Sequence, residues 1–229
     1  MRALKIVLVL SLFISVDMFS QSLSVGLGTG LNIISGDKYY TDGLGRIGIY
    51  YNTNGTHTSF HGLSLNNEIQ FQVGAKYSFL NFPFNLLAII QYYLMRGNGL
   101  VNIYDNFLER EFQYKVTTKL DIWSLQFGGS YLLNFYPFRP FITASALFNY
   151  FGDVYVELAQ DKSLSEYPDY ENGMRYGFSL GAGISYNIYS NIELELQSRY
   201  NDLNLLHRRD GEEKLSSTSI LLNVYYKVF

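Results

Sequence analysis

The chain of 229 residues has no cysteine, only four prolines and one tryptophan, and charged residues make up just 16% of it. The absence of cysteine excludes a disulfide scaffold, a thiolate metal site and a cysteine nucleophile. The charged share is well below the roughly 25% of an ordinary soluble domain. A formal net charge of −3 argues against a nucleic-acid-binding protein, which would need a basic face. We expect no cofactor and no nucleic-acid partner.

Long hydrophobic runs are also missing, because no window after residue 20 holds 18 consecutive apolar residues. Residues 1–20 carry the positive charges of Arg2 and Lys5, followed by the apolar stretch Ile6–Val16. That stretch is shorter than the roughly 20 residues of a membrane-spanning helix and is typical of a secretory signal peptide. We therefore expect a signal peptide over 1–20, with an uncleaved anchor as the alternative, and one folded domain over 21–229.

What the chain does have is aromatic residues, at 17%, and a regular alternation of apolar with small or polar residues. A period of two is typical of β-strands, in which successive side chains point to opposite faces. In residues 22–34, for example, leucine, valine and isoleucine share one parity, while serine, glycine and asparagine share the other. The pattern recurs seven more times, over residues 68–79, 84–94, 119–133, 142–150, 175–188, 192–201 and 220–229.

The connections between these eight segments alternate between short and long. Three are short, around residues 81–83, 135–138 and 189–190, and four are long, at about 35–66, 97–116, 152–173 and 204–216. Short turns at one end and long loops at the other indicate an antiparallel up-and-down barrel of eight strands with both termini at the short-turn end. A weak hairpin around residues 52–55 leaves a ten-stranded barrel open.

Volume decides whether the apolar face points into such a barrel or away from it. An eight-stranded barrel holds only about a dozen large side chains, many fewer than the apolar face supplies. The apolar face therefore meets lipid, and the lumen takes the small and polar residues. This reasoning predicts an all-β, eight-stranded transmembrane β-barrel in the bacterial outer membrane, with short periplasmic turns, long extracellular loops and periplasmic termini. We expect a monomer surrounded by outer-membrane lipids and lipopolysaccharide.

One segment conflicts with this arrangement. Lys119 and Asp121 share the parity of the apolar residues Trp123 and Leu125, which would place two charges on the lipid-facing side. A β-bulge near Ile122, or a strand end that stands above the membrane, would resolve the conflict.

Aromatic residues gather near both ends of the expected strands, as in the interfacial girdles of outer-membrane barrels. The alternative is that aromatics are simply good strand formers. The expected girdle residues are Tyr77, Phe79, Phe84, Tyr186, Tyr226 and Phe229 near the short turns, and Tyr92, Phe148, Tyr150, Tyr176 and Tyr200 near the long loops.

The expected lumen contains charges of both signs, which we interpret as a salt-bridged polar network that fills a narrow interior. If Leu203 faces Ser217, then Glu193 lies opposite Lys227. The alternative is a small gated pore. The network residues are Glu68, Lys76, Arg175, Glu193, Glu195, Arg199 and Lys227.

The residues also bear on a lipid-modifying activity and on metal binding. A lipid A-modifying enzyme would need a histidine with a serine or aspartate, and the chain offers His57, His61 and His207 in long loops, near Ser59, Ser64, Asp202 and Asp210. The acidic residues of the third long loop could bind Ca²⁺, although their spacing matches no calcium-loop template. We expect neither catalysis nor a metal site.

Three stretches carry a resemblance to a known family: Thr118–Leu125 (TKLDIWSL), Arg139–Tyr150 (RPFITASALFNY) and Tyr176–Asn204, together with the terminal Phe229. The chain resembles the small outer-membrane β-barrel family of OmpA-like and PorT-like proteins common in the Bacteroidetes lineage. The resemblance implies the fold, the outer-membrane location, insertion by the barrel-assembly machinery, and a structural, surface-recognition or secretion-associated role. It implies no activity, because members of the family do different things.

Overall fold

The described part of the computed structural model consists of β-strands and connecting turns. No helix in its described part is long and apolar enough to cross a membrane. The expected signal segment, 1–20, lies outside the described residues. The structure describes residues 21–36, 48–52, 55–59, 65–66, 68–79, 82–105, 110–133, 135–158, 164–166, 171–208 and 212–229.

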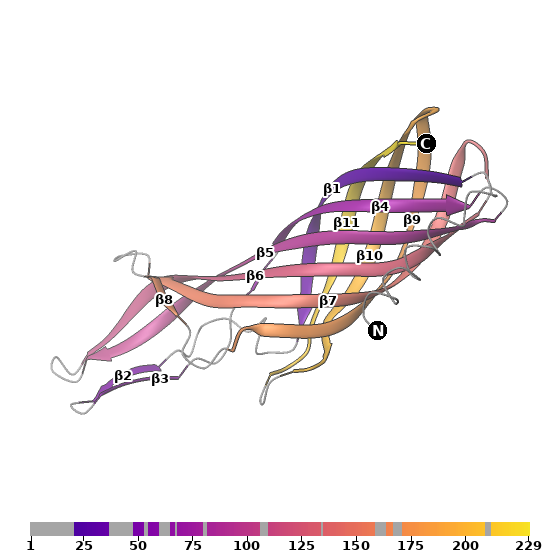
Figure 1. Cartoon of the computed structure of the whole chain (residues 1–229). Helices are drawn as coiled ribbons and strands as arrows, with labels where there is room; N and C mark the ends of the chain where they lie inside the picture. Colours follow the sequence, from indigo (N-terminus) through magenta and orange to yellow (C-terminus); the bar gives the residue numbers. More distant parts are fainter. Residues whose placement is uncertain are drawn as a thin grey trace, which may run out of the picture.

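Eight strands form a closed antiparallel barrel, which confirms the predicted fold class (Figure 1). Closure comes from β1, which pairs with β4 on one side and with β11, the last strand of the chain, on the other. The wall strands are β1 (Gln21–Gly36), β4 (Glu68–Phe79), β5 (Phe84–Asp105), β6 (Arg110–Leu132), β7 (Phe138–Leu158), β9 (Gly173–Tyr189), β10 (Ile192–Leu206) and β11 (Leu215–Lys227).

The register of the strands sets how far they tilt. Following paired residues once around the wall from Ser24 leads back to β1 at Ile34, ten residues further along the strand. With about 3.3 Å per residue and about 4.8 Å between strands, this stagger tilts the strands by about 40° from the barrel axis. Transmembrane barrels of this kind have tilts of about 35–45°.

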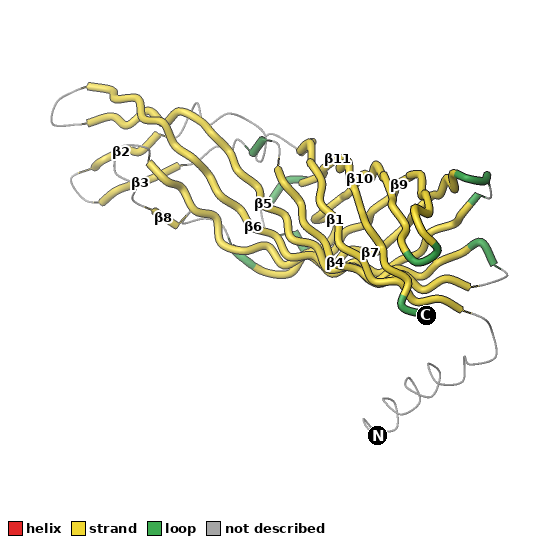
Figure 2. Tube along the Cα trace, turned by 90° about the horizontal axis from the view of Figure 1, so that it is seen from above, coloured by secondary structure: helices red, strands yellow, loops and turns green. Residues whose placement is uncertain are grey.

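One end of the barrel carries the three short connections, as predicted. They join β4 to β5, β6 to β7, and β9 to β10. The C-terminus lies at the same end, where Val228 N donates a hydrogen bond to Leu23 O at 2.8 Å and extends the pairing of the last strand with the first (Figure 2).

At the opposite end the structure corrects the expected loops. Residues 97–116 are not a long loop, because β5 and β6 continue as one hairpin until Asp105 lies opposite Arg110. β7 likewise continues to Leu158 and pairs with the short strand β8 (Leu164–Glu166). The sequence did not reveal these extensions because strands need a regular apolar alternation only where one face is apolar.

The hairpin around residues 52–55 is present, but the barrel does not have ten strands. β2 (Gly48–Asn52) and β3 (Gly55–Ser59) pair with each other, and β2 pairs in parallel with the extension of β5. The hairpin therefore lies beside the extended β5–β6 end in Figure 1, outside the closed circle of eight strands.

The two parities of the wall strands point in the predicted directions. On the outer face, Leu27 is 67% exposed and Val73 is 58% exposed, although both are aliphatic. On the inner face, the polar residues Gln72 and Asn223 are buried. The barrel thus has an apolar outside and a largely polar inside, the reverse of a soluble domain.

The two charges of β6 stay on the outer face although the expected β-bulge is present. A bulge does lie near Ile122, but it falls between β6 and β7 and places Gly152 and Asp153 opposite Asp121. The bulge changes which residues of β7 point inward. It does not change the alternation of β6, in which Leu120 and Ile122 are both buried in the lumen. Lys119 and Asp121 consequently stay on the outer face, near the extended end of the strand.

Because the β2–β3 hairpin is not part of the wall, its removal should leave the barrel intact. We expect a variant in which residues 48–59 are replaced by a short Gly-Ser linker to refold and to show the same heat-dependent shift on detergent gels as the full chain. Loss of that shift would mean that the hairpin belongs to the closed wall. A control variant that lacks residues 84–94 of β5 should not refold.

Candidate functional site in the barrel lumen

The side chains that fill the lumen lie in layers along the barrel axis. The layer nearest the short turns is an ion cluster centred on Lys76, which is 2% exposed. Lys76 Nζ donates to Glu193 Oε2 at 2.6 Å and to Glu195 Oε1 at 2.7 Å. Arg139 Nη2 donates to the second oxygen of Glu193 at 3.1 Å. Two cations and two carboxylates therefore balance one another across the lumen, so that each buried charge has a partner.

The pairing partner of Glu193 differs from the expectation. Glu193 lies opposite Tyr225, two residues before Lys227, and the Lys76 ammonium lies 4.4 Å from the centre of the Tyr225 ring. A shift of two residues leaves every side chain on its original face, so the alternation in the sequence cannot distinguish the two registers. Lys227 still faces the lumen side, at its mouth.

The central layer surrounds the guanidinium of Arg199 with side-chain amides. Arg199 is 1% exposed, and it donates to Gln126 Oε1 at 2.7 Å and to Gln72 Oε1 at 2.5 Å. Gln72 in turn donates to Asn223 Oδ1. Gly181 permits this arrangement, because a Cβ there would lie 2.5 Å from Arg199 Cγ. Strands on opposite sides of the barrel are thereby cross-linked through the lumen.

Toward the extended end, the lumen also contains a layer of buried apolar side chains, which sequence analysis missed. The buried residues of this layer come from five of the wall strands. The signal was present in β6, since the outward parity of Lys119 and Asp121 requires that Leu120 and Ile122 point inward. The residues of this apolar layer are Met95, Leu120, Ile122, Phe151, Val154, Leu203 and Leu215.

Two ion pairs lie beside the apolar layer. Arg175, 1% exposed, donates from Nε to Glu212 Oε2 at 2.9 Å, and its guanidinium lies 5.2 Å from the Phe151 ring centre. Lys214 Nζ lies 3.1 Å from Asp202 Oδ2, and hydrogen bonds to Tyr200 and Asp202 raise the pKa of Lys214.

Of the seven network residues expected in the lumen, the structure brings Lys76, Glu193 and Glu195 into one cluster. Arg199 and Arg175 lie in separate layers. The backbone of Glu68 pairs with Asn32, and its side chain lies outside the described residues.

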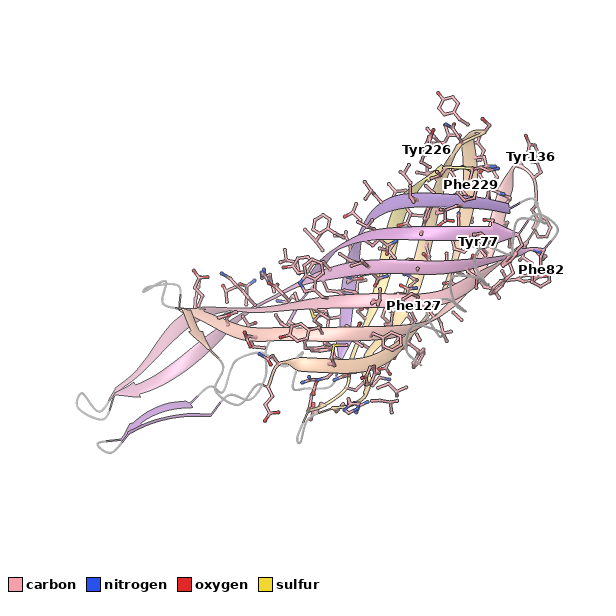
Figure 3. All side chains as sticks on the ribbon, viewed as in Figure 1. Tyr77, Phe82, Phe127, Tyr136, Tyr226 and Phe229 are labelled. Carbon is pink, nitrogen blue, oxygen red and sulfur yellow. The ribbon has the colours of Figure 1, made fainter. Side chains whose placement is uncertain are left out.

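Aromatic side chains form two bands on the outer face. Tyr77, Phe82, Tyr136, Tyr226 and Phe229 gather at the short-turn end (Figure 3). Ring contacts at that end join Tyr77 to Phe79, Phe82 to Phe84, and Phe138 to Tyr186. Nearer the extended end, contacts join Tyr92 to Trp123, Phe148 to Tyr176, and Phe178 to Tyr200, and Tyr150 is exposed on the same face.

The separation of the bands can be estimated along a single strand. Phe138 and Phe148 are ten residues apart on β7, about 33 Å along the strand and about 25 Å along the axis at a tilt of about 40°. The apolar band of outer-membrane barrels is about 25 Å tall. The ion pairs of the outer face, Arg96 with Asp121 and Lys119 with Glu157, lie beyond the second band.

The residues considered for catalysis do not form a described constellation. His207 is exposed and lies against the Tyr176 ring at 5.2 Å, while the carboxylate of Asp202 contacts Lys214. The side chains of His57 and His61 lie outside the described residues. Within the described part of the chain, no group of three or more His, Cys, Asp or Glu side chains could hold a metal ion.

No family model matches the chain, and no curated protein matches its sequence. Solved structures do match its fold. Neisserial surface protein A (NspA) superposes with a TM-score of 0.53 at 14% identity, covering 90% of this chain and 98% of its own. Ail, the attachment invasion locus protein of Yersinia pestis, gives 0.47 at 11% identity, covering 91% and 99%. The likeness to NspA shows that the two chains share the eight-stranded barrel fold.

The Lys76 cluster offers a direct test of lumen packing. Lys76→Met leaves two buried carboxylates facing each other without their shared cation, which should lower the free energy of unfolding by about 3–5 kcal/mol. The additional changes Glu193→Gln and Glu195→Gln should restore most of the loss. Denaturant unfolding of the refolded barrel in lipid vesicles measures both.

Lys119→Met is the matched control, because it removes a lysine from a partly exposed ion pair on the outer face. It should cost no more than about 1 kcal/mol. Equal losses for Lys76→Met and Lys119→Met would contradict the assignment of Lys76 to a buried cluster.

Proposed function

We propose that this protein is an integral barrel of the bacterial outer membrane that acts without catalysis, as a structural, surface-recognition or secretion-associated protein. The observation that carries the proposal is the closed wall, apolar on the outside and filled with side chains on the inside. Exposed side chains such as Leu27, Val73 and Ile142 would form a very large apolar surface in water, whereas they suit the hydrocarbon of a bilayer. Closure satisfies the backbone hydrogen-bonding groups of the edge strands, since hydrocarbon offers no partners for the N–H and C=O groups of an open sheet edge.

The two aromatic bands support a specific position in the membrane. We place the short-turn band at the periplasmic interface and the other at the outer interface, where lipopolysaccharide would surround the wall. The ion pairs of Arg96 and Lys119 then stand above the hydrocarbon, near the lipopolysaccharide phosphates. The termini are periplasmic in this orientation, which suits secretion and insertion by the barrel-assembly machinery.

The extended strands are the best candidates for contacts outside the cell. The β5–β6 hairpin, with β2, β3 and β8 beside it, continues the wall well beyond the second aromatic band (Figures 1 and 2). We assign this end to recognition because it projects beyond the second aromatic band. The OmpA-like and PorT-like family assignment rests on the sequence stretches alone and stays a prediction.

Charge placement on the outer face tests the membrane position. Leu222→Arg puts a charge halfway between the two aromatic bands and should lower the free energy of unfolding in vesicles by about 2–4 kcal/mol. Ile188→Arg, on the same face beside a short turn, should cost about 1 kcal/mol or less, because it lies at the interface. Equal costs at the two positions would show that no bilayer crosses the barrel there.

The filled lumen favours a closed barrel over the small gated pore. Because the ion cluster, the amide layer and the apolar layer block the lumen in succession, the purified protein should produce no ion conductance in planar bilayers. Glu193→Gln should remain silent as well, since it removes one carboxylate but leaves the apolar layer in place. Steady single-channel currents from either protein would favour the pore.

A further inference from the structure

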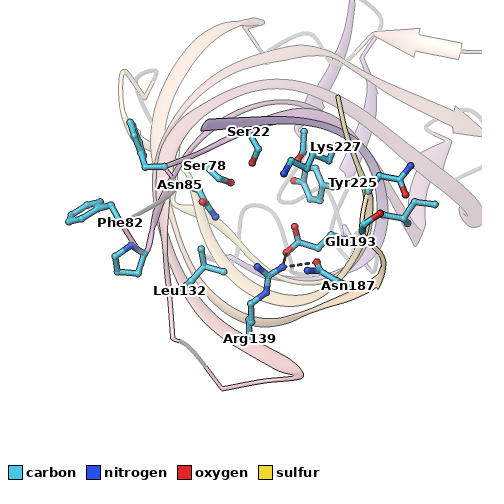
Figure 4. Close-up of a pocket in the computed structure, with 16 residues that line it drawn as sticks. Ser22, Ser78, Phe82, Asn85, Leu132, Arg139, Asn187, Glu193, Tyr225 and Lys227 are labelled. Carbon is cyan, nitrogen blue, oxygen red and sulfur yellow. Dashed lines mark hydrogen bonds and ion pairs between the residues drawn. The ribbon is translucent and has the colours of Figure 1, made fainter. Parts of the chain in front are cut away.

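The mouth of the barrel at the short-turn end contains a cavity of about 430 Å³ (Figure 4). This volume lies within the range of about 300–1,000 Å³ that is usual for small-molecule sites in proteins. The ion cluster of Lys76 lies just beneath the cavity, because Glu193 and Tyr225 belong to both the cluster and the cavity lining. A small molecule that enters from the short-turn side therefore meets the ion cluster at the bottom.

The side chains around the cavity carry an excess of positive charge. Arg139 and Lys227 both line it, and Glu193 is the one carboxylate among the lining residues. That carboxylate is already bonded to Lys76 at 2.6 Å and to Arg139 at 3.1 Å, and Lys76 also binds Glu195. Within the described part of the chain, Lys227 makes no ion pair. Three cations thus stand against two carboxylates, which suits a ligand with a single negative charge.

Hydroxyl and amide side chains form another part of the lining. Ser22 of β1 pairs with Ser78 of β4, and Ser78 pairs with Asn85 of β5, so these residues form a continuous row across three strands. All three line the cavity, and Ser78 and Asn85 lie across the opening from Glu193 in Figure 4. Hydroxyl and amide groups can both donate and accept hydrogen bonds, so this row suits a ligand with hydroxyl groups.

Phe82 does not make this side of the cavity apolar. Its ring points away from the opening in Figure 4, and its centre lies 6.2 Å from that of the Phe84 ring on the outer face. Asn85, the next residue of β5, is buried and donates to Ser130 Oγ at 3.2 Å. Leu132 adds an apolar contact between Asn85 and the charged side. A matching ligand is therefore polar at both ends and charged at only one.

We propose that this mouth cavity binds a small sugar that carries one carboxylate. The carboxylate would accept charge-assisted hydrogen bonds from the Lys227 ammonium and the Arg139 guanidinium, and the sugar hydroxyls would bond to the row that contains Ser22 and Ser78. A neutral sugar would leave the excess charge unmatched, and a bare anion would leave the row unused. Access from the periplasm rests on the orientation proposed above, whereas the binding itself does not.

The test uses the full-length barrel refolded in micelles of an uncharged detergent, with glucuronate as the probe. Amide chemical shifts recorded by NMR should change around Asn187, Asn191 and Lys227 as glucuronate is added. The methyl ester of glucuronate keeps the hydroxyls without the charge, and acetate keeps the charge without the hydroxyls. Each should bind at least about fivefold more weakly than glucuronate. Equal binding of glucuronate and either control would overturn the proposal.

Variants separate the two halves of the site. Lys227→Gln should weaken glucuronate binding by about threefold to tenfold and leave the methyl ester unaffected. The double change Ser22→Ala and Ser78→Ala should weaken glucuronate binding to a similar degree and leave acetate unaffected, because it removes hydroxyls and no charge.

Lys119→Gln, at the far end, is the matched control for Lys227→Gln and should leave glucuronate binding unchanged. Equal losses for the two lysine variants, or shifts confined to the far end, would overturn the proposal. Tighter binding of glycerol 3-phosphate than of glucuronate would overturn it in favour of a lipid headgroup.

The outcome can be distinguished from failure of the proposed function. A protein that tolerates Ile188→Arg, is destabilised by Leu222→Arg and ignores glucuronate would retain the membrane assignment and lose only the sugar site.

Discussion

Closure of the eight-stranded wall is the constraint on which the rest of the structure depends. Pairing of β1 with β11 satisfies the backbone hydrogen bonds of the last free edge, and it fixes a lumen that is only wide enough for side chains. The apolar parity of every strand must then face outward, because the lumen has no room for it. The polar parity faces inward for the same reason, and burial there favours polar groups that bond to one another, because the space excludes bulk water.

The layers of the lumen show how this constraint is met. Lys76 is held between two carboxylates, and Arg199 is surrounded by the amides of glutamines that project from other strands. Such contacts tie together strands that are far apart around the wall. In the proposed membrane position the lumen therefore adds rigidity that the outer face would not provide, since apolar side chains gain little from one another in lipid. Above them, Phe151 and its neighbours form an apolar layer, with the ion pair of Arg175 and Glu212 beside it.

The same division into layers separates the two ends by chemistry. At the short-turn end the ion cluster forms the floor of an open, cationic cavity, whereas at the other end the apolar layer closes the lumen beneath an extended wall. Because filled layers lie between the two ends, the recognition proposed for the extended end needs no path through the barrel.

The sequence by itself determined the strand count of the wall, the three short turns, the direction of each face and the inward parity of Lys76, Glu193 and Arg199, because period-two alternation and side-chain volume are local properties of the chain. It did not identify Arg139, Asp202 or Glu212 as members of the lumen ion pairs. Only the tertiary structure decided the registers. A slip of two residues leaves every side chain on its original face. Only the structure could therefore show that Lys76, and not Lys227, forms the ion pair with Glu193. The structure alone also showed the β5–β6 extension, where the sequence lacks a regular apolar alternation, and the cavity at the mouth, whose lining comes from residues distant in the chain.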